Sequence, residues 1–367
     1  MPQFTWFQYV VFMVTINLGT ALTGTPSLIS NYTVRSGWIA ALLMSIGVIV
    51  SASIVEIFIR IFPKKTLNQA YQQAFGKKVG WIFGLWMVFW FYVTDCIVFK
   101  EVMMFLGDAI FPNTPAYLLG LPMLVLMFFV LWLDIQVIAR MIEFSLPIII
   151  GLLVVIPLAM MNLDIKLLFP LAPDSWSDVW KASVSPIFTY TIELMVSLML
   201  VDVIPDEKRL SQYLLLAGGI IVAIHMVGEL MIILVLGDAS KNLIYPVLEI
   251  VRSIRIGKYI ERLDTIIVMG IITAGFFKLS LFHYGMVKSL QEISFVTSKR
   301  SVIYLTAVAI WAGSEALFPT NKDAMEALLN FTPSYFIFSL LLLPLFAILA
   351  ESLRVFINQK IKPQKSM

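Results

Sequence analysis

The sequence has little with which to hold a metal ion or a haem. It contains one cysteine, Cys96, and two histidines in 367 residues, and these side chains do not have the spacing of a zinc or haem site. The HExxH, Walker A and GxSxG motifs are missing as well. We therefore expect no metal, no cofactor and no enzymatic activity.

Charge is also scarce. Asp, Glu, Lys and Arg make up 13% of the residues and hydrophobic residues 60%, with a mean hydropathy of +0.91, whereas soluble domains carry about 25% charged residues. The chain is therefore expected to be an integral membrane protein. Its basic residues fall in short loops between apolar runs, so they predict topology and not nucleic-acid binding. MPQFTWFQYV has no Lys or Arg, so we expect no cleaved signal peptide.

Ten apolar runs, each long enough to cross a bilayer as a helix, are separated by charged or Gly- and Pro-containing loops. A helix satisfies its own backbone hydrogen bonds in lipid, so the fold class is predicted to be all-α within one transmembrane domain over 1–367. The predicted spans 1 to 10 are 6–30, 37–60, 80–107, 116–133, 142–162, 184–204, 212–236, 264–288, 302–318 and 333–356.

The loop charges predict the orientation. If the N-terminus is inside, fifteen Lys and Arg residues lie in inside segments and nine in outside segments, so both termini are predicted to be cytoplasmic. Five of the nine outside residues fall in 237–263. Within it, Val247, Ile250, Ile254 and Ile260 have helical spacing, which predicts an outer amphipathic segment at 240–263, although a solvated loop would also accommodate these charges.

The first span contains residues that weaken a helix. Residues 15–30 read TINLGTALTGTPSLIS, and a break in lipid is tolerated only where it lines a cavity or where neighbouring groups satisfy the freed backbone. The stretch therefore predicts a broken span 1 that binds a ligand. A close-packing seam is the alternative, because its small residues are also four apart. The ligand-binding candidates are Gly19, Thr20, Thr23, Gly24 and Thr25.

Two sets of five spans, 6–162 and 184–356, would form an inverted repeat in which span 6 corresponds to span 1. Span 6 contains SPIFTYTIELMVSLMLVD, residues 185–202, with polar residues near its centre. In inverted-repeat transporters, two discontinuous spans face each other near the middle of the membrane and present helix ends to the ligand. The candidates in this predicted second broken span are Thr189, Tyr190, Thr191 and Glu193.

An ionisable residue within a span is costly and suggests a function. Lys278, in GFFKLSLFHYG of span 8, is predicted to neutralise free carbonyls of span 1 in place of a cation; snorkelling to the inner interface is the alternative. Asp95 in span 3 is the second candidate for a coupling or ion-site role. Lys100 and Glu101 are expected to pair at the outer interface.

Span 7 carries His225 and Glu229 four residues apart, on one helix face. This spacing is typical of a hydrogen-bonded pair inside the bundle, and it would also suit a proton relay.

Residues 245–264, YPVLEIVRSIRIGKYIERLD, resemble the segment between spans 7 and 8 of permease-like spore germination proteins, the B subunits of nutrient germinant receptors. The basic loop at 64–80, the Glu193-bearing span 6 and the FFKLS of span 8 agree in order and spacing, so the resemblance covers essentially the whole chain. One departure is the span 6 hinge, where relatives commonly have glycine and this chain has threonine and tyrosine. The matching positions of the first segment are Tyr245, Pro246, Glu261, Arg262, Leu263 and Asp264.

The resemblance implies the LeuT-like five-plus-five fold of the amino acid, polyamine and organocation superfamily. It also implies a subunit of the spore inner membrane that senses an amino acid or another small nutrient between spans 1 and 6. The expected partners are an A subunit, which is a membrane protein with soluble domains, and a C subunit, which is a lipoprotein.

Two other functions remain open from the sequence. A proton-coupled amino acid transporter would use the same fold and pocket, with Glu193 or Lys278 carrying the coupling. A channel or scaffold for the release of spore solutes is the third hypothesis.

Overall fold

Helices account for all regular structure in the part of the chain that the computed structural model describes, residues 4–133, 135–158, 163–204, 206–254, 263–294 and 298–361. The long helices are α1 (Trp6–Ser30), α2 (Gly37–Ile61), α3 (Leu67–Ala109), α4 (Ala116–Leu133), α5 (Ile135–Leu158), α7 (Leu210–Met231), α9 (Asp264–Ile293), α10 (Lys299–Leu317) and α13 (Leu343–Ile361). The shorter ones are α6 (Trp176–Ser185), α8 (Pro246–Ser253), α11 (Asn321–Glu326) and α12 (Thr332–Phe336).

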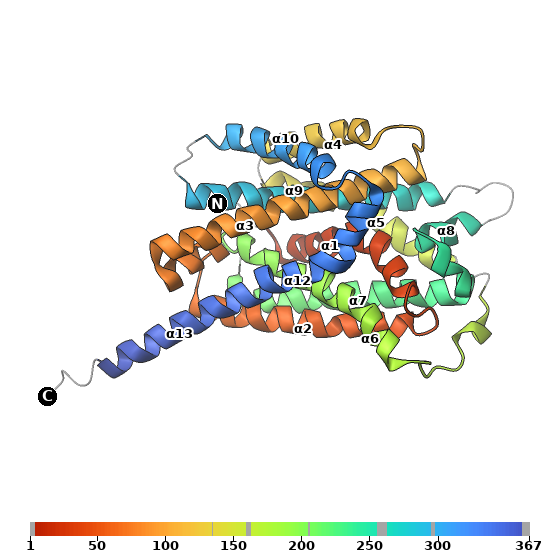
Figure 1. Ribbon diagram of the computed structural model, residues 1–367, viewed down its shortest axis with the longest axis horizontal. Coiled ribbons are helices and arrows are strands. Elements are labelled where there is room, and N and C mark those ends of the chain that lie inside the picture. Colours follow the sequence, from red (N-terminus) through yellow and green to blue (C-terminus); the bar gives the residue numbers. More distant parts are fainter. Residues whose placement is uncertain are drawn as a thin grey trace.

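Short 3-10 or π-helical stretches extend or join several of these helices. They are η2 (Ile165–Leu168), η3 (Pro186–Thr191), η4 (Ile192–Leu200), η5 (Glu207–Arg209), η6 (Ile232–Leu236), η7 (Gly237–Asn242), η8 (Ala327–Phe331) and η9 (Ile337–Leu342). Together the elements form one elongated bundle, from which α13 leaves at one end (Figure 1).

Eight helical segments in the described ranges are long and apolar enough to cross a membrane. They correspond to predicted spans 1, 2, 3, 4, 6, 7, 8 and 10, which confirms an all-α membrane protein. Spans 5 and 9 fall on α5 and α10, which are not among the eight, so the count of ten stays a prediction. α5 begins at Ile135 and not at 142, and α3 begins at Leu67 and not at 80.

The early start of α3 has a local cause. Thr66 accepts from the backbone N–H of Gln69, and the Gln69 side chain accepts from the backbone N–H of Thr66. This capping box begins a helix ahead of the apolar run. Gly76, with φ of +82°, then bends the chain, and the 43-residue helix continues to Ala109; a residue with a side chain adopts this backbone conformation only rarely.

Span 1 is not broken. α1 is one continuous α-helix of 25 residues that contains both Gly24 and Pro26, so the expected discontinuity is wrong. A Cβ atom on Gly19 would lie 2.6 Å from the carbonyl carbon of Ala274 in α9. The missing side chain therefore lets two helix backbones approach closely, as the packing-seam alternative describes.

Span 6 does leave α-helical geometry near its middle. α6 ends at Ser185, the π-helical η3 follows, and the 3-10 stretch η4 completes the span. The irregularity expected there is therefore present, and it forms without a glycine hinge.

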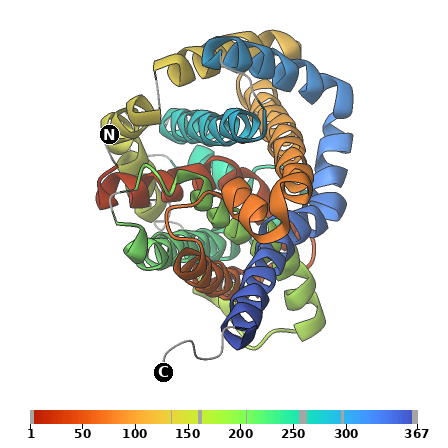
Figure 2. The same ribbon diagram turned by 90° about the vertical axis from the view of Figure 1, so that its left-hand side faces the viewer.

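Four pairs of spans that are five apart in the chain pack against each other. α2 packs along α7, α3 along α9 and α4 along α10, while α1 contacts both α6 and η3 of span 6. Figure 2 shows α4 and α10 together along one side of the bundle. A five-plus-five repeat predicts these pairs, and the inversion of one half relative to the other stays a prediction.

Both ends of the described chain lie at the same end of the bundle. The backbone N–H of Phe4 donates to Val203 O at 2.9 Å, where span 6 ends. In α13, Arg354 Nη1 donates to Gln73 O at 3.2 Å, close to the turn that joins α2 and α3. Two chain ends on one side agree with the predicted topology. That this side is cytoplasmic stays a prediction.

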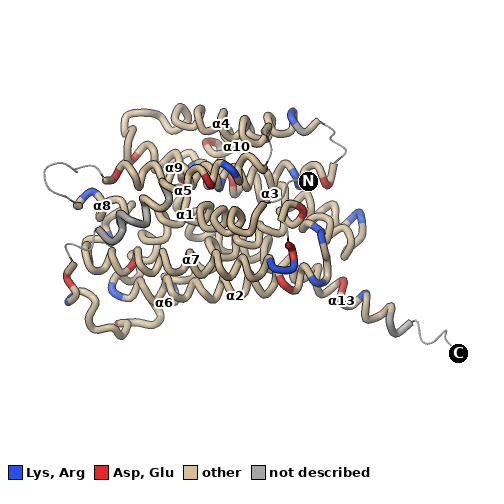
Figure 3. Tube along the Cα trace, turned by 180° about the vertical axis from the view of Figure 1, so that it is seen from behind, with Lys and Arg blue, Asp and Glu red and all other residues tan. Residues whose placement is uncertain are grey.

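At the opposite end, α8 buries Leu248, Ile250 and Val251 and exposes Arg252. Residues 246–253 therefore form a helix with one buried apolar side, as the amphipathic prediction expects, while the outer amphipathic segment 240–263 as a whole stays a prediction. Residues 255–262, with Glu261 and Arg262 of the family motif, lie outside the described residues. Charged residues gather mainly toward the two ends of the bundle (Figure 3).

The contact between α1 and α9 can be tested with two glycines. Gly19→Ala should lower the free energy of unfolding by about 1–3 kcal/mol, because the added methyl group meets backbone atoms that cannot turn aside. Gly219 in α7 has no atom within 4 Å of its Cβ position, so Gly219→Ala should be neutral or stabilising. Unfolding of the purified chain in detergent measures both, and equal stability of the two variants would contradict the tight contact.

Candidate functional site

A buried ion pair joins span 8 to span 6 at the centre of the bundle. Lys278 Nζ lies 2.7 Å from Glu193 Oε2 and donates at 2.7 Å to Thr20 Oγ1 of α1. The two charged side chains are 3% and 1% exposed. Snorkelling of Lys278 is therefore excluded. Its partners are a carboxylate and a hydroxyl, not the free span 1 carbonyls that were expected, because α1 is unbroken and its carbonyls are engaged within the helix.

Side chains of neighbouring helices donate hydrogen bonds to the oxygens of the irregular part of span 6. Asn17 Nδ2 in α1 donates to Tyr190 O at 2.7 Å and to Glu193 Oε1 at 3.3 Å. Ser51 Oγ in α2 donates to Thr191 O at 3.2 Å. Where the hydrogen-bond spacing of a helix changes, its carbonyls become open to other donors, and in lipid those donors must come from the protein. The irregular turn is thus held by α1 and α2.

Asn17 was not singled out from the sequence. The signal was present, because an amide within an apolar span needs hydrogen-bond partners inside the bundle.

A small cavity adjoins the ion pair. It lies between α1, α3, span 6, α9 and the segment from η8 to α12. The space open to the centre of a water molecule amounts to about 10 Å³, which is room for about one water molecule. A molecule the size of an amino acid enters only if the walls move apart.

Three hydroxyl groups of the cavity wall have no hydrogen-bond partner in the described structure. They belong to Thr94, Thr189 and Tyr190, and each of these residues is at most 3% exposed. Buried polar groups in proteins nearly always have a partner. Three such groups around one cavity are available for hydrogen bonds to a small polar molecule, a water molecule included.

Glu101 also faces the cavity, which corrects its expected pairing with Lys100. Lys100 instead lies 3.0 Å from Glu315 of α10, because the two neighbouring residues point to different sides of α3. Thr94, Val98 and Glu101 share one face by their i, i+4, i+7 spacing. This spacing was a signal that the sequence offered.

The structure brings part of the predicted site together. Thr20, Thr189, Tyr190, Glu193 and Lys278 line the cavity. Gly24 lies at its edge, since a Cβ atom there would be 2.6 Å from Tyr190 Oη and 3.9 Å from Glu101 Oε1.

Other candidates point elsewhere. Gly19 packs against α9, and Thr23 Oγ1 donates to Thr20 O at 2.8 Å within α1. The Thr25 hydroxyl is buried without a partner in the described part of the chain, and it does not line the cavity. Thr191 Oγ1 donates to Ile187 O at 2.7 Å and lies against Gly47 of α2.

Asp95 is fully buried on α3, but it is not among the cavity-lining residues. Neither of its carboxylate oxygens has a hydrogen-bond partner in the ranges that the structure describes. Its coupling role stays a prediction.

His225 and Glu229 are both buried in α7, but no hydrogen bond between them is present among the described residues, so the expected pair does not form there. His225 Nε2 and Glu229 Oε1 have no described partner at all. Glu229 Oε2 instead lies beside Gly37, at the start of α2.

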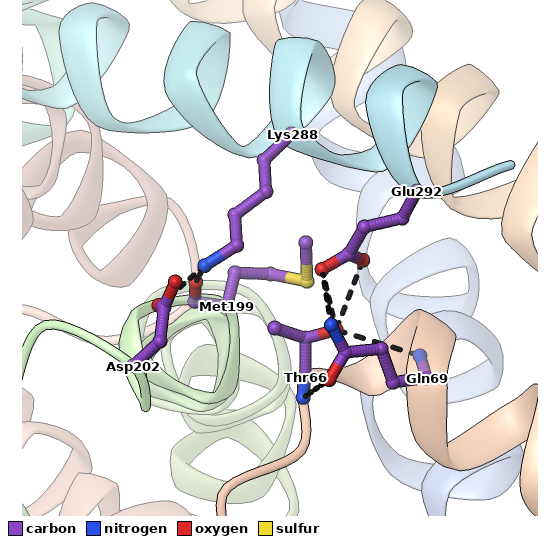
Figure 4. A network of polar contacts seen from close by, with 6 residues as sticks. All are labelled: Thr66, Gln69, Met199, Asp202, Lys288 and Glu292. Atoms are coloured by element: carbon purple, nitrogen blue, oxygen red, sulfur yellow. Dashed lines mark hydrogen bonds and ion pairs between the residues drawn. The ribbon is translucent and has the colours of Figure 1, made fainter. Parts of the chain in front are cut away.

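A polar network ties the ends of three spans together at the end of the bundle that holds both chain ends (Figure 4). Lys288 of α9 donates to Met199 O at 2.8 Å and pairs with Asp202, just after span 6. One turn along α9, Glu292 accepts from Thr66 Oγ1 at 2.9 Å. The network closes the predicted inner side below the cavity.

A hollow of about 300 Å³ lies toward the other end. Ser27 of α1, Met104 of α3 and Met325 of α11 line it. These residues stand one or two helical turns beyond Thr20, Glu101 and Leu328, which line the central cavity. The hollow therefore lies above the cavity on the predicted outer side.

Known proteins match the chain across these elements. A family model described as "Spore germination protein" matches residues 3–319. Spore germination protein KB of Bacillus subtilis (strain 168) is 22% identical over 340 residues, which cover 89% of this chain and 88% of that protein. Spore germination protein XB of Bacillus anthracis is 24% identical over 279 residues, which cover 75% and 77%.

The ion pair makes a prediction for paired substitutions. Lys278→Met should lower the free energy of unfolding by about 3–5 kcal/mol, because it leaves the Glu193 carboxylate buried without a counter-charge. Adding Glu193→Gln to Lys278→Met should recover much of that loss. Unfolding of both single variants and the double variant in detergent completes the cycle, and losses that simply add would contradict direct coupling.

Proposed function

Because the chain belongs to the spore germination protein family, we propose that it is the nutrient-sensing B subunit of a spore germinant receptor. The ligand site is the cavity beside the Lys278–Glu193 pair. The observation that carries this assignment is the group of three unpartnered hydroxyls, on Thr94, Thr189 and Tyr190, around a cavity at mid-bundle. A small polar molecule can supply the partners that these groups lack.

The ligand class is an amino acid or a nutrient of similar size. The expected carboxylate contact with backbone N–H groups at Thr23–Thr25 does not suit α1, whose N–H groups lie within a continuous helix. The Thr94, Thr189 and Tyr190 hydroxyls and the Lys278 ammonium are the donors that face the cavity, so a ligand carboxylate binds among them.

Sensing follows from the closed state of the cavity. Tyr190 Oη stands against Gly24 on the side of the outer hollow, and the Lys288 and Glu292 contacts close the other side. A ligand that needs more room favours a more open arrangement of span 6 against α1. Such a ligand shifts the population of the two states by its differential affinity for them.

The receptor role implies the partners and the location that the family resemblance predicts. The proposed partners are the A and C subunits, which read the shift of span 6, and the proposed location is the spore inner membrane with both termini cytoplasmic. Lys278 takes the place that a coupling cation would otherwise fill, so no metal ion is required. Nothing need cross the membrane for this function.

Gly24→Leu tests the site in spores. The added side chain meets Tyr190 Oη and the rim of the cavity, so germination with the cognate nutrient should be lost while the subunit level stays normal. Gly219→Leu adds the same bulk to an exposed helix face and should respond as the wild type does. Release of dipicolinic acid measures germination, and a normal response of Gly24→Leu would count against this pocket.

A proton-coupled transporter is the second candidate, favoured by buried carboxyl groups near the cavity. Uptake of radiolabelled amino acids by proteoliposomes that hold this subunit alone separates the two functions. We expect no accumulation in response to a proton gradient. Saturable, gradient-driven accumulation that Glu193→Gln abolishes would instead favour transport.

A further inference from the structure

The charges that face the cavity do not balance. Apart from the Tyr190 phenol, three ionisable side chains line it: Lys278, Glu193 and Glu101. The first two neutralise each other across 2.7 Å. This leaves one carboxyl group, on Glu101, in excess.

No second cation of the described residues lies at the cavity. The neighbouring Lys100 is directed to Glu315 of α10, and Lys278 is the one basic residue in the cavity wall. Glu101 accepts no hydrogen bond from a described residue, whereas Glu193 accepts from both Lys278 and Asn17. An uncompensated carboxylate is unfavourable in a buried site, so Glu101 is the group that gains most from an added positive charge.

The backbone carbonyls of the irregular turn near the cavity already have donors. Tyr190 O accepts from Asn17, and Thr191 O accepts from Ser51. Each carbonyl can accept a second hydrogen bond, but it carries no formal charge, so it attracts an ammonium group less strongly than the Glu101 carboxylate does. Glu101 accepts from no residue in the described ranges, and it lies on the side of the cavity nearer the outer hollow, since Met104 of that hollow is one turn further along α3.

We infer that Glu101 is the specificity-determining residue that binds the protonated amino group of the ligand. This inference rests on the proposed ligand site and names its substrate class, small molecules that carry an ammonium group. The Lys278–Glu193 pair stays intact as the fixed part of the site. A ligand of net negative charge, without an amino group, adds to the excess and is rejected.

Matched ligands test the inference. The full chain in lipid nanodiscs is titrated calorimetrically with the common amino acids. The one that binds most tightly is then compared with its 2-hydroxy acid, which lacks the ammonium, and with its amide, which keeps it. Wild type should bind the amino acid and the amide, and it should bind the hydroxy acid at least about 10-fold more weakly, as expected for a hydrogen bond to a charged group.

Glu101→Gln keeps the shape of the side chain and removes its charge. It should weaken binding of the amino acid by about 10- to 100-fold and strengthen binding of the hydroxy acid, because the excess negative charge that rejects it is gone, so the preference disappears. Glu229→Gln is the matched control, because it neutralises a buried carboxyl group of α7 that does not line the cavity. It should keep the wild-type preference.

Each other outcome overturns the inference in a distinguishable way. If Glu101→Gln binds the amino acid with the wild-type preference, another group recognises the ammonium and the ligand site itself survives. If Na⁺ strengthens amino acid binding by wild type but not by Glu101→Gln, Glu101 holds an inorganic cation instead. If wild type binds the hydroxy acid as tightly as the amino acid, the inference fails. This result uses wild type alone, so it does not depend on whether Glu101→Gln folds. If no amino acid binds, the inference fails, because its ligand class carries an ammonium group, whereas the Gly24→Leu germination assay tests the proposed ligand site separately.

Discussion

The salt bridge between Lys278 and Glu193 is the interaction around which the centre of this bundle is arranged. Two opposite charges in a low-dielectric interior are stable only when each meets the other with good geometry and the remaining donors and acceptors are satisfied. Thr20 and Asn17 of α1 supply those further contacts. Spans 1, 6 and 8 are therefore tied at one point, and the cavity, the irregular turn and the unpartnered hydroxyls all lie around it.

The irregular turn of span 6 depends on the same neighbours. In lipid, an open carbonyl finds no water, so an interruption persists only where other parts of the protein donate to it. Asn17 and Ser51 provide these donors from two helices that are themselves regular. One interrupted span beside an unbroken one is thus enough to place polar groups at mid-depth, and a second break in α1 is not needed.

This arrangement suits a sensor better than an open passage. The cavity accepts about one water molecule, and polar contacts close the predicted inner side while Tyr190 closes the outer side against Gly24. In the proposed receptor, a ligand acts on this site by stabilising a state in which span 6 stands further from α1. The contacts of Lys288 with Met199 and Asp202 connect the end of span 6 to α9, so a shift of span 6 reaches the side where both chain ends lie.

The sequence by itself determined the class of fold, because runs of about 20 apolar residues can satisfy their backbone in lipid only as helices. It also identified Glu193 and Lys278, since a charge within a span is costly wherever its partner lies. Only the tertiary structure decided which faces of the helices meet. Gly19 packs against α9, Lys100 pairs with Glu315 while Glu101 faces the cavity, and α1 stays continuous. The sequence could not settle these outcomes, because each depends on atoms of helices far away in the chain.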